Sequence, residues 1–590
     1  MSDIETRQYD ALIIGAGGAG LRAALQLAQA NLKVAVVSKV FPTRSHTVAA
    51  QGGINAALAN VLPDNWHWHM FDTVKGSDYL GDQDAIEYMC KVAPQVVYEL
   101  EHSGVPFSRL DNGKIYQRPF GGQSQNFGGD QAARTCAAAD RTGHVILHTL
   151  YQQNIREQTN FYDEFFAVEL IDDLDGGIQG ALCLGIESGE LVMIQARATL
   201  LATGGHGQIY KTTSNALINT GDGVAMCLRR GIPAEDMEFY QFHPTGIAGK
   251  GMLLTEGCRG EGGFLVNADG ERFMERYAPN AKDLASRDVV SRAIFTEVQE
   301  GRGVGPNKDA VHLQLHHLGA EVIAKRLPGI RQTCITFLGL DPVEKPIPVY
   351  PTAHYVMGGI PTDFNGRAVG RDGAGPEDPV AGLYAAGECA CVSVHGGNRL
   401  GGNSLLDILV FGRSAAIHME TVLTQGDGHK PLNQDAVAAA AAQVTRWDED
   451  RPGGEAVPAL KRELRAAMEK YCGVFREASL LAEGVTAVGE ICQRIRDNAV
   501  ISDHSKTFNT ARIEALELRN LADVAIATMA SAHYRQESRG AHSRVDYPKR
   551  DDANWLKHSL YYATDGRMDF KPVRLQPLTV DSFPPKERVY

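Results

Sequence analysis

Short apolar runs that end in glycine turns mark the N-terminal part of the chain. Residues Tyr9–Ile14 (YDALII) are followed by GAGGAG at 15–20, a helix-like stretch at 21–30 and a second apolar run at 33–37 (KVAVV). Strand, glycine turn, helix and strand within ~30 residues predict a βαβ unit that binds a dinucleotide. The first glycine should allow the tight turn, the second should admit a pyrophosphate, and the last should let the helix pack on the strand.

From Gln434 onward the hydrophobic pattern becomes helical. Apolar residues recur every three or four positions in two stretches, and a third stretch, 511–534, has the same pattern. The spacing predicts a helical bundle whose apolar stripes form its core. The residues of the first two stripes are Leu460, Leu464, Ala467, Met468, Tyr471, Val488, Ile491, Cys492 and Ile495.

The composition is that of a globular protein and excludes several classes. Of the 590 residues, 44% are hydrophobic and 22% are charged, which excludes a disordered, fibrous or coiled-coil chain. The net charge of -13 argues against nucleic-acid binding, so an anionic substrate would need positive charge concentrated in a pocket. Glycines and polar residues interrupt the most apolar stretch, 11–37, so we expect no membrane span. The polar N-terminus lacks a secretory pattern, which indicates a cytosolic compartment.

The cysteines show no metal-binding pattern. The 10 cysteines are scattered, only Cys389 and Cys391 lie close in sequence, and there is no CxxC pair. We therefore expect no zinc site, no iron–sulfur ligand set and no disulfide framework. Any iron–sulfur cluster that this protein uses must belong to another chain.

The second predicted strand departs from the pattern of an NAD site. It ends in Ser38 and Lys39, where an acidic residue would bind the ribose of NAD. Two later apolar runs, TLLATGG at 199–205 and GLYAAGECA at 382–390, also end in glycine turns. With the opening motif they resemble two-dinucleotide-type flavoproteins, in which such segments return the chain to FAD. The nucleotide domain is then expected to be discontinuous.

A resemblance to one family covers nearly the whole chain. Eight motifs in order resemble the flavoprotein subunits of the succinate dehydrogenase and fumarate reductase family. They are GAGGAG at 15–20, RSHTVAAQGG at 44–53, HPTG at 243–246, TEGCRGEGG at 255–263, SRD at 286–288, HYVMGG at 354–359, GNRLGGNSL at 397–405 and ESRGAHSRVDYPKRDD at 537–552.

The resemblance implies FAD joined covalently through its 8α-methyl group to His46. In this family the link raises the potential of the flavin enough for it to accept a hydride from a saturated acid. The cofactor-binding residues so implied are Gly15, Ala16, Gly17, Gly18, Ala19, Gly20, Ser38, Lys39, Thr43, Ser45, His46, Thr47, Gln51, Gly52, Gly53, Asp222, Glu388, Arg399, Ser404 and Leu405.

The resemblance also implies a dicarboxylate site. Arg399 and His354 would bind one carboxylate of succinate, and His243 and Thr255 the other. A planar guanidinium suits a bidentate grip on a carboxylate. Each histidine could equally be a hydrogen-bonded structural residue. Cys258, inside TEGCRG, is expected near the site and open to thiol reagents.

The catalytic residues implied by the resemblance are Arg287, Glu256 and Arg259. A guanidinium is essentially always protonated in water, so Arg287 is unusual as a base. A relay that hands protons through Glu256 and Arg259 to solvent would resolve this, since two cations keep Glu256 ionised. An ordinary Glu–Arg ion pair is the alternative.

The predicted fold is α/β with a discontinuous, Rossmann-like FAD-binding domain. It comprises residues 1–236 and 354–425, with an inserted α+β capping domain at 237–353. A helical-bundle domain at 426–536 and a small C-terminal domain at 537–590 follow. Hinge motion of the cap would exclude water from the flavin.

The resemblance implies partners as well. An iron–sulfur subunit would take electrons from the flavin, and through it membrane-anchor subunits of the cytochrome b type would reduce quinone. The protein would be peripheral, on the cytoplasmic face of the bacterial plasma membrane, in respiratory complex II and the tricarboxylic acid cycle. The C-terminal motif would lie near the partner, with Arg539 and Arg544 approaching the flavin edge.

Three other functions compete with succinate oxidation. A quinol:fumarate reductase would have nearly the same site, although Gln51 favours the dehydrogenase. An L-aspartate oxidase lacks the flavin-linking histidine, so His46 argues against it. A non-catalytic FAD-binding scaffold or assembly protein conflicts with the clustered candidate residues Thr255, Glu256, Arg259, Arg287 and Arg399.

Overall fold

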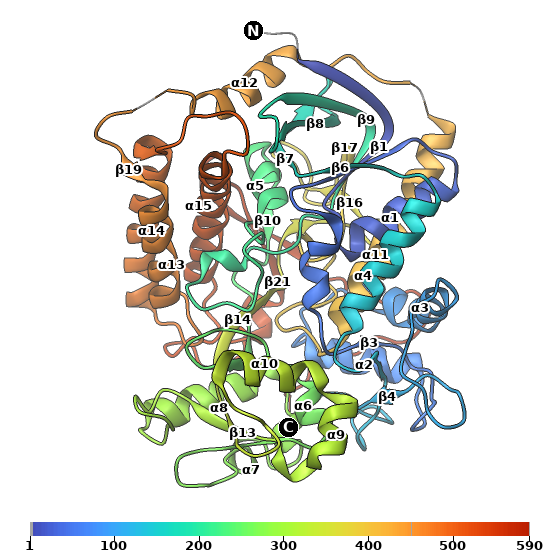
Figure 1. Ribbon diagram of the computed structural model, residues 1–590, viewed down its shortest axis with the longest axis vertical. Helices are drawn as coiled ribbons and strands as arrows, with labels where there is room; N and C mark the ends of the chain where they lie inside the picture. Colours follow the sequence, from blue (N-terminus) through green and yellow to red (C-terminus); the bar gives the residue numbers. More distant parts are fainter. Residues whose placement is uncertain (1–3, 427, 450, 589–590) are drawn as a thin grey trace.

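The centre of the protein is an eight-stranded sheet. The structure is a computed structural model that describes residues 4–426, 428–449 and 451–588 (Figure 1). The strands of the sheet follow one another in the order β16-β17-β9-β1-β2-β6, and they are parallel except for β16. An antiparallel hairpin of β7 and β8 joins the sheet where β8 pairs with β9. The strands are β1 (Glu5–Ile14), β2 (Val34–Ser38), β6 (Asn160–Asp163), β7 (Phe165–Asp172), β8 (Ile178–Gly185), β9 (Leu191–Leu201), β16 (Arg367–Val369) and β17 (Pro379–Ala385).

The two faces of this sheet pack into two different cores. Successive side chains of a strand point to opposite sides. Leu12 and Ile14 of β1 therefore join the core that the C-terminal helices share, whereas Ala11 and Ile13 join the core with the N-terminal helices. Because both faces are covered, the central strands appear in the sequence as continuous apolar runs.

Four long helices cover the second of these cores. They are α1 (Gly18–Gln29), α3 (Gln83–His102), α4 (Thr142–Arg156) and α11 (Asn403–Gln425). The expected strand–helix–strand unit is confirmed, but α1 begins at Gly18, three residues before the helix-like stretch. The glycine turn itself thus forms the first turn of the helix. Shorter elements of this region are α2 (Trp66–Gly76), β3 (Ile54–Asn55), β4 (Gln117–Arg118) and β5 (Thr135–Cys136).

A separate antiparallel sheet lies at one end of the molecule (Figure 1). Its strand order is β11-β14-β13-β12, and it has its own apolar core. We call residues 237–353, which contain most of this sheet, the cap. Its elements are β11 (Tyr240–Ile247), β12 (Phe264–Val266), β13 (Val311–Gln314), β14 (Ile347–Val356), α6 (Gly257–Gly260), α7 (Met274–Tyr277), α8 (Arg287–Gln299), α9 (Gly319–Arg326) and α10 (Pro328–Leu338).

The predicted C-terminal helices are confirmed. They are α12 (Gln434–Thr445), α13 (Val457–Tyr471), α14 (Ala478–Asn498) and α15 (Thr510–Tyr534), and the last packs on α5 (Asp222–Arg229). Most residues of the expected stripes, such as Leu464 and Val488, are fully buried. The stripes therefore form the core of the bundle.

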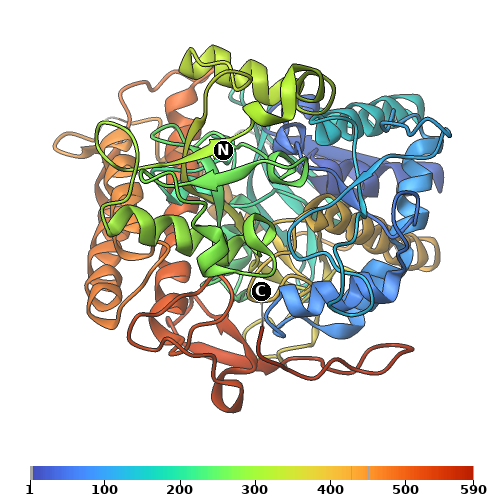
Figure 2. The ribbon, with the colours of Figure 1, turned by 90° about the horizontal axis from the view of Figure 1, so that it is seen from below.

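The chain after α15 returns to the body of the protein. It forms α16 (Asp552–Trp555) and then a hairpin of β21 (Lys557–Tyr561) and β22 (Met568–Pro572), of which β21 also pairs with β10 (Ala234–Glu235). Its last part runs between the cap and the N-terminal helices (Figure 2). The remaining two-residue strands are β15 (Ile360–Pro361), β18 (Ala390–Cys391), β19 (Glu455–Ala456) and β20 (Ala499–Val500).

The expectations about membrane spans and about cysteines concern the chain as a whole. Among the described helices, none combines the length and the apolar character needed to cross a bilayer. All ten cysteines are buried free thiols, including the neighbouring pair Cys389 and Cys391.

The packing of α1 on β1 gives the first prediction. In Gly20→Ala the added Cβ would lie 1.9 Å from the carbonyl oxygen of Gly15. Overpacking of this kind costs ~1–3 kcal/mol, so the variant should unfold at a lower temperature and retain less flavin. The control is Gly489→Ala on α14, where the new Cβ meets no atom within 4 Å. There alanine should stabilise the helix by up to ~1 kcal/mol. A Gly20→Ala protein as stable as the wild type would contradict the close packing of α1 against β1 at Gly20.

Candidate active site

One cavity of about 720 Å³ lies where the sheet meets the cap. It is lined by the GAGGAG turn, by the loop at 45–53 and by residues from β11, β14 and α8. Most of the sequence-predicted residues line it. The exceptions are Gly20, Thr43, Glu256 and Arg259. Gly20 instead faces the strand, while Thr43 belongs to a short 3₁₀ turn, Pro42–Arg44, that is not part of the cavity lining.

The glycine turn has the geometry that a pyrophosphate needs. Gly15 has φ 111°, and a Cβ there would lie 2.2 Å from the carbonyl oxygen of Ala202. The amide of Gly18 donates to Thr47 Oγ1 (3.0 Å), and Ser45 Oγ donates to the carbonyl oxygen of Ala16 (3.0 Å). These bonds hold the histidine loop against the N-terminus of α1, where backbone amides favour a phosphate.

Lys39 explains why the second strand lacks a terminal acidic residue. Its Nζ contacts Asp222 Oδ2 (2.8 Å) and Glu517 Oε1 (2.7 Å). Burial opposes the charge, but these two carboxylates raise the pKa of Lys39. The acidic side chain at this edge of the cavity thus comes from Asp222, at the start of α5. Glu517 comes from α15, and nothing in the sequence pairs it with Lys39.

His46 lies at the cavity as a neutral imidazole. Its Nδ1 accepts a hydrogen bond from the amide of Ala216 (3.3 Å), and its Nε2 has no protein partner among the described residues. Burial lowers the pKa of His46 to about 4. The ring therefore has a defined tautomer, with Nε2 as the nitrogen left for another group.

Arg399 carries a buried charge that is not paired with any carboxylate of the described residues. Its Nη2 donates to Gln241 Oε1 (3.3 Å), its guanidinium lies 4.2 Å from the ring centroid of Tyr355, and its Nε is buried with no acceptor. Burial, reinforced by the nearby Arg287, lowers the pKa of Arg399 to about 9. An anion with two oxygens would satisfy the free donors and offset the charge.

Two neutral histidines lie beside these arginines. The rings of His243 and His354 are 5.0 Å apart. His243 Nδ1 accepts from the amide of Thr245 (3.2 Å), and His354 Nδ1 lies 2.7 Å from Ser214 Oγ. Burial and the charge of Arg287 lower the pKa of both well below the usual value. His243 can therefore donate from Nε2.

Arg287 separates the cavity from Glu256. Its Nε donates to Glu256 Oε2 (2.7 Å), and the amide of Gly121 donates to Glu256 Oε1 (2.7 Å). Burial opposes the charge, but Arg287 and Arg259 hold the pKa of Glu256 below its usual value. Arg259 donates to the carbonyl oxygen of Asp283, and its Nε and Nη2 are buried without partners. The order from cavity inward is thus Arg287 and then Glu256.

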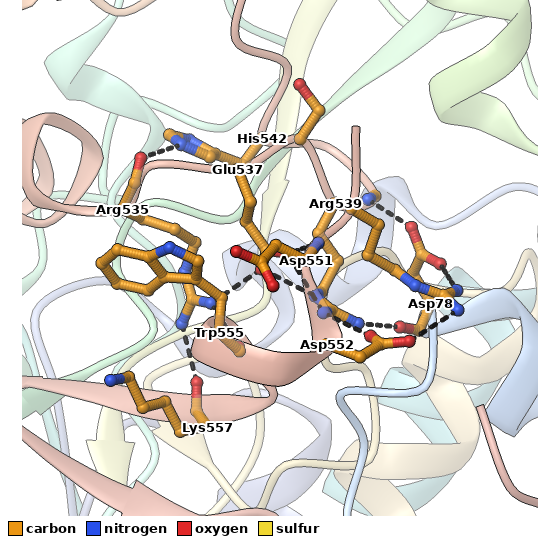
Figure 3. Close-up of polar contacts among 12 residues, drawn as sticks. Asp78, Arg535, Glu537, Arg539, His542, Asp551, Asp552, Trp555 and Lys557 are labelled. Carbon is orange, nitrogen blue, oxygen red and sulfur yellow. Dashed lines mark hydrogen bonds and ion pairs between the residues drawn. The ribbon is translucent and has the colours of Figure 1, made fainter. Parts of the chain in front are cut away.

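Two sequence expectations are wrong. Cys258 is fully buried in α6, and burial raises the pKa of its thiol, so it is closed to thiol reagents. Arg539 and Arg544 do not approach the cavity. Arg539 is bound by Glu537 and Asp552 (Figure 3), and Arg544 by Asp546, because the C-terminal loop needs these charges for its own ion pairs.

Gln241 is the residue that the sequence analysis missed. Its Oε1 accepts from Arg287 Nη1 (3.0 Å) as well as from Arg399, so it holds both cations together. Its Nε2 donates to Asn398 Oδ1 (2.8 Å). Gln241 precedes His243 by two positions on β11, and side chains two apart share one face of a strand. That spacing was the available signal.

A second buried polar cluster is structural. Glu235, Asp236 and His558 lie close enough to resemble a metal site. However, His558 Nδ1 lies 2.6 Å from Asp236 Oδ2 and Nε2 3.1 Å from Asp82 Oδ1. Burial opposes the charge, but the surrounding carboxylates raise the pKa of His558 to about 10. A doubly protonated imidazole has no lone pair for a metal.

The fold and the cavity together define an FAD-dependent flavoprotein. The family model described as an FAD binding domain matches residues 10–405, and the model described as fumarate reductase flavoprotein C-term matches residues 461–590. The chain is 58% identical to the succinate dehydrogenase flavoprotein subunit of Coxiella burnetii, over 100% of both chains. It belongs to the family of succinate dehydrogenase flavoprotein subunits.

Solved structures agree with this assignment. Quinol fumarate reductase from E. coli matches with a TM-score of 0.91 and 40% identity, over 100% of this chain and 99% of that chain. Mycobacterium smegmatis Sdh1, solved in complex with UQ1, matches with a TM-score of 0.83 and 37% identity, over 98% of this chain and 96% of that chain. The predicted α/β flavoprotein fold is confirmed.

The charge of Arg399 gives the second prediction. Arg399→Lys keeps a charge but loses the planar fork, and Arg399→Ala loses both, so malonate and succinate should bind progressively more weakly. Loss of one partner of a desolvated charge pair costs ~2–5 kcal/mol. Titration of the flavin-loaded protein with malonate measures the change. Arg367→Lys, at a half-exposed ion pair with Asp363, should bind normally. Unchanged affinity in Arg399→Ala would remove it from the substrate site.

Proposed function

We propose that this flavoprotein subunit oxidises succinate to fumarate within a succinate:quinone oxidoreductase. The observation that carries the proposal is the uncompensated buried charge of Arg399, beside Arg287, in the cavity that also contains the FAD-binding turn. Arg399 would bind one carboxylate of a dicarboxylate directly, while Arg287, already paired with Glu256, lies beside it. The family to which the chain belongs is named for succinate dehydrogenase, and in that reaction a dicarboxylate reacts with FAD.

We propose two groups of residues that hold the two carboxylates of succinate. Arg399 and His354 bind one, and His243 and Thr255 bind the other through neutral donors. All four line the one cavity. Fixing both ends aligns the central carbons for reaction, which lowers the entropy cost of the step. FAD, when bound, supplies the acceptor for the hydride of one methylene.

We infer that Arg287 takes the proton from the second methylene. Glu256 Oε2 first takes the Nε proton of Arg287, which leaves a neutral guanidine. This guanidine then accepts the methylene proton and becomes a guanidinium again, while the first proton stays on Glu256. The 2.7 Å contact between Nε and Oε2 supports the transfer. Arg259 then passes the proton toward solvent. Among the described residues Arg259 donates to the carbonyl oxygen of Asp283 and makes no direct bond to Glu256, so its buried Nε and Nη2 are the donors left for this step.

We also propose a covalent bond between FAD and His46. The site fits the cofactor, because the glycine turn and the loop at 45–53 line one cavity and Gln51 Oε1 is buried there without a partner. Nε2 of His46 would form the bond. Nδ1 would keep its bond to the amide of Ala216, so attachment requires no rotation of the ring.

We propose that the chain is divided into four domains and that one of them, the cap, moves. We propose an FAD-binding domain at 1–236 and 354–425, a capping domain at 237–353, a helical domain at 426–536 and a C-terminal domain at 537–590. Cap and FAD-binding domain each contribute substrate residues, so closure would complete the site and exclude water.

We propose that electrons leave through partner subunits. The scattered cysteines of the sequence lack the spacing of an iron–sulfur ligand set, which supports an electron acceptor on a separate iron–sulfur subunit. Through it, membrane anchors of the cytochrome b type would reduce quinone. The flavoprotein would then be a peripheral subunit on the cytoplasmic face of the bacterial plasma membrane.

The direction of the reaction is tested in the assembled complex. The higher identity to a succinate dehydrogenase subunit (58%) than to the quinol fumarate reductase (40%) favours succinate oxidation. We expect succinate oxidation with quinone to exceed fumarate reduction with a matched quinol. Faster fumarate reduction would favour the quinol:fumarate reductase instead, and absence of both activities would overturn the proposal.

The covalent link gives the third prediction. Wild-type protein denatured in acid should show flavin fluorescence on a gel at 63.9 kDa, the mass of the chain. His46→Ala should retain FAD without the link, so its band should be dark. Succinate oxidation should fall much more than fumarate reduction, because only oxidation needs the raised potential. His316→Ala, a histidine outside the cavity, should remain fluorescent. A dark wild-type band from flavin-loaded protein would contradict the link.

The proton relay gives the fourth prediction. Arg287→Lys and Glu256→Gln should each bind succinate nearly normally but turn over far more slowly. Loss of an interaction made only in the transition state lowers kcat without raising KM. In the double variant the loss of turnover should be much less than the sum of the two single losses, in free-energy terms, if both residues belong to one relay. Steady-state kinetics at several pH values measure these effects. A steep rise in KM with kcat preserved would identify Arg287 as a binding cation only.

A further inference from the structure

The C-terminal loop contacts both halves of the substrate site from behind. The amide of Ala541 donates to the carbonyl oxygen of Gly397 (2.8 Å), two residues before Arg399. On the other side Arg292 Nη1, five residues after Arg287 on α8, donates to the carbonyl oxygen of Gly540 (2.9 Å). One short loop therefore contacts both the segment that carries Arg399 and the helix that carries Arg287.

This loop is held closely against the FAD-binding part of the chain. Gly540 has φ 51°, and a Cβ there would lie 2.1 Å from the carbonyl oxygen of Gly397. Its amide donates to Asp78 Oδ2 (2.8 Å). The preceding Arg539 donates from Nη1 to the carbonyl oxygen of Asp78 (2.8 Å) and pairs with Glu537 (Figure 3). The position of the loop is thus fixed by both backbone and charge.

Arg588 links the same aspartate to the cap. Its Nη2 lies 3.0 Å from Asp78 Oδ2 and 2.8 Å from Asp288 Oδ2. Asp288 directly follows Arg287 in the first turn of α8, and it also accepts from Ser286 Oγ (2.5 Å) and pairs with Arg292 (3.1 Å). Both aspartates are almost fully buried, with side-chain exposures of 6% and 0%.

We infer that Arg588 and the Gly540 loop form a brace that fixes Arg287 relative to Arg399. Arg588 and Asp288 are then positioning residues for the reaction, although neither lines the cavity. The inference rests on the proposed function, in which both arginines act on one dicarboxylate.

The brace has a simple physical basis. Without Arg588, the carboxylates of Asp78 and Asp288 would face each other across the boundary between FAD-binding part and cap with less compensation. Like charges in a buried setting repel strongly, so the first turn of α8 would shift away. A displacement of about 1 Å at a distant support can lower a rate by about 100-fold.

The choice between arginine and lysine at this position is informative. One nitrogen of Arg588, Nη2, makes the contacts to both aspartates, so the bridge between them needs one charged nitrogen at this point. Lysine also offers one charged nitrogen with several donors. Arg588→Lys should therefore restore what Arg588→Ala loses, which a need for arginine packing alone would not allow.

The test uses the assembled, flavin-loaded complex with Arg588→Ala, Arg588→Lys and a control, Arg567→Ala. Arg567 is another C-terminal arginine that bridges two carboxylates, Asp372 and Asp565, but it is 38% exposed. Amide hydrogen exchange of residues 286–292 and steady-state succinate kinetics are measured well below the unfolding temperature.

We expect faster exchange at 286–292 and a fall of about 10- to 100-fold in kcat/KM for Arg588→Ala. Arg588→Lys should be close to wild type, and Arg567→Ala should change neither quantity. Asp288→Asn combined with Arg588→Ala should be less than additive, since both break one contact.

Two outcomes would overturn the brace. Unchanged exchange and kinetics in Arg588→Ala would show that α8 needs no such support. A lower unfolding temperature with both quantities unchanged would show an ordinary stabilising ion pair. Exchange reports on the brace whatever the substrate is, whereas failure of the wild-type complex to oxidise succinate would contradict the proposed function alone.

Discussion

The buried charge of Arg399 is the constraint on which the site depends. A guanidinium taken out of water without a carboxylate partner is costly, and Arg287 adds a second cation beside it. Gln241 partly relieves this by accepting a hydrogen bond from each. The remaining free donors make the site complementary to an anion that the protein itself does not supply. The buried charge is thus electrostatically unfavourable at the place where the proposed ligand would bind.

The rest of the structure keeps these cations in place. Arg287 is held by Glu256 on the cap, and Arg399 lies in a loop supported from behind by the C-terminal segment. In contrast to Arg399, the arginines of the C-terminal segment are paired with carboxylates, as Arg539 is with Glu537. A chain with a net charge of -13 therefore concentrates uncompensated positive charge in one pocket, where it can select a dianion.

The uncharged state of the histidines in the site is linked to the same buried charges. Burial and nearby arginines keep His243 and His354 uncharged, so they can offer hydrogen bonds to a carboxylate without adding to the repulsion among cations. His46 is neutral through burial alone. Cavity shape and charge together thus determine the protonation of three histidines that the sequence shows only as polar residues in three motifs.

The sequence by itself determined the elements whose cause is local. Apolar runs, glycine turns and helical stripes predicted β1, α1, β2 and the C-terminal bundle, because strand and helix periods are written directly in neighbouring residues. Motif resemblance supplied the candidate residues. Only the tertiary structure decided how distant charges pair: Lys39 with Glu517, and both Asp78 and Asp288 with Arg588. Such pairings depend on distances between elements far apart in the chain, and no local pattern encodes them.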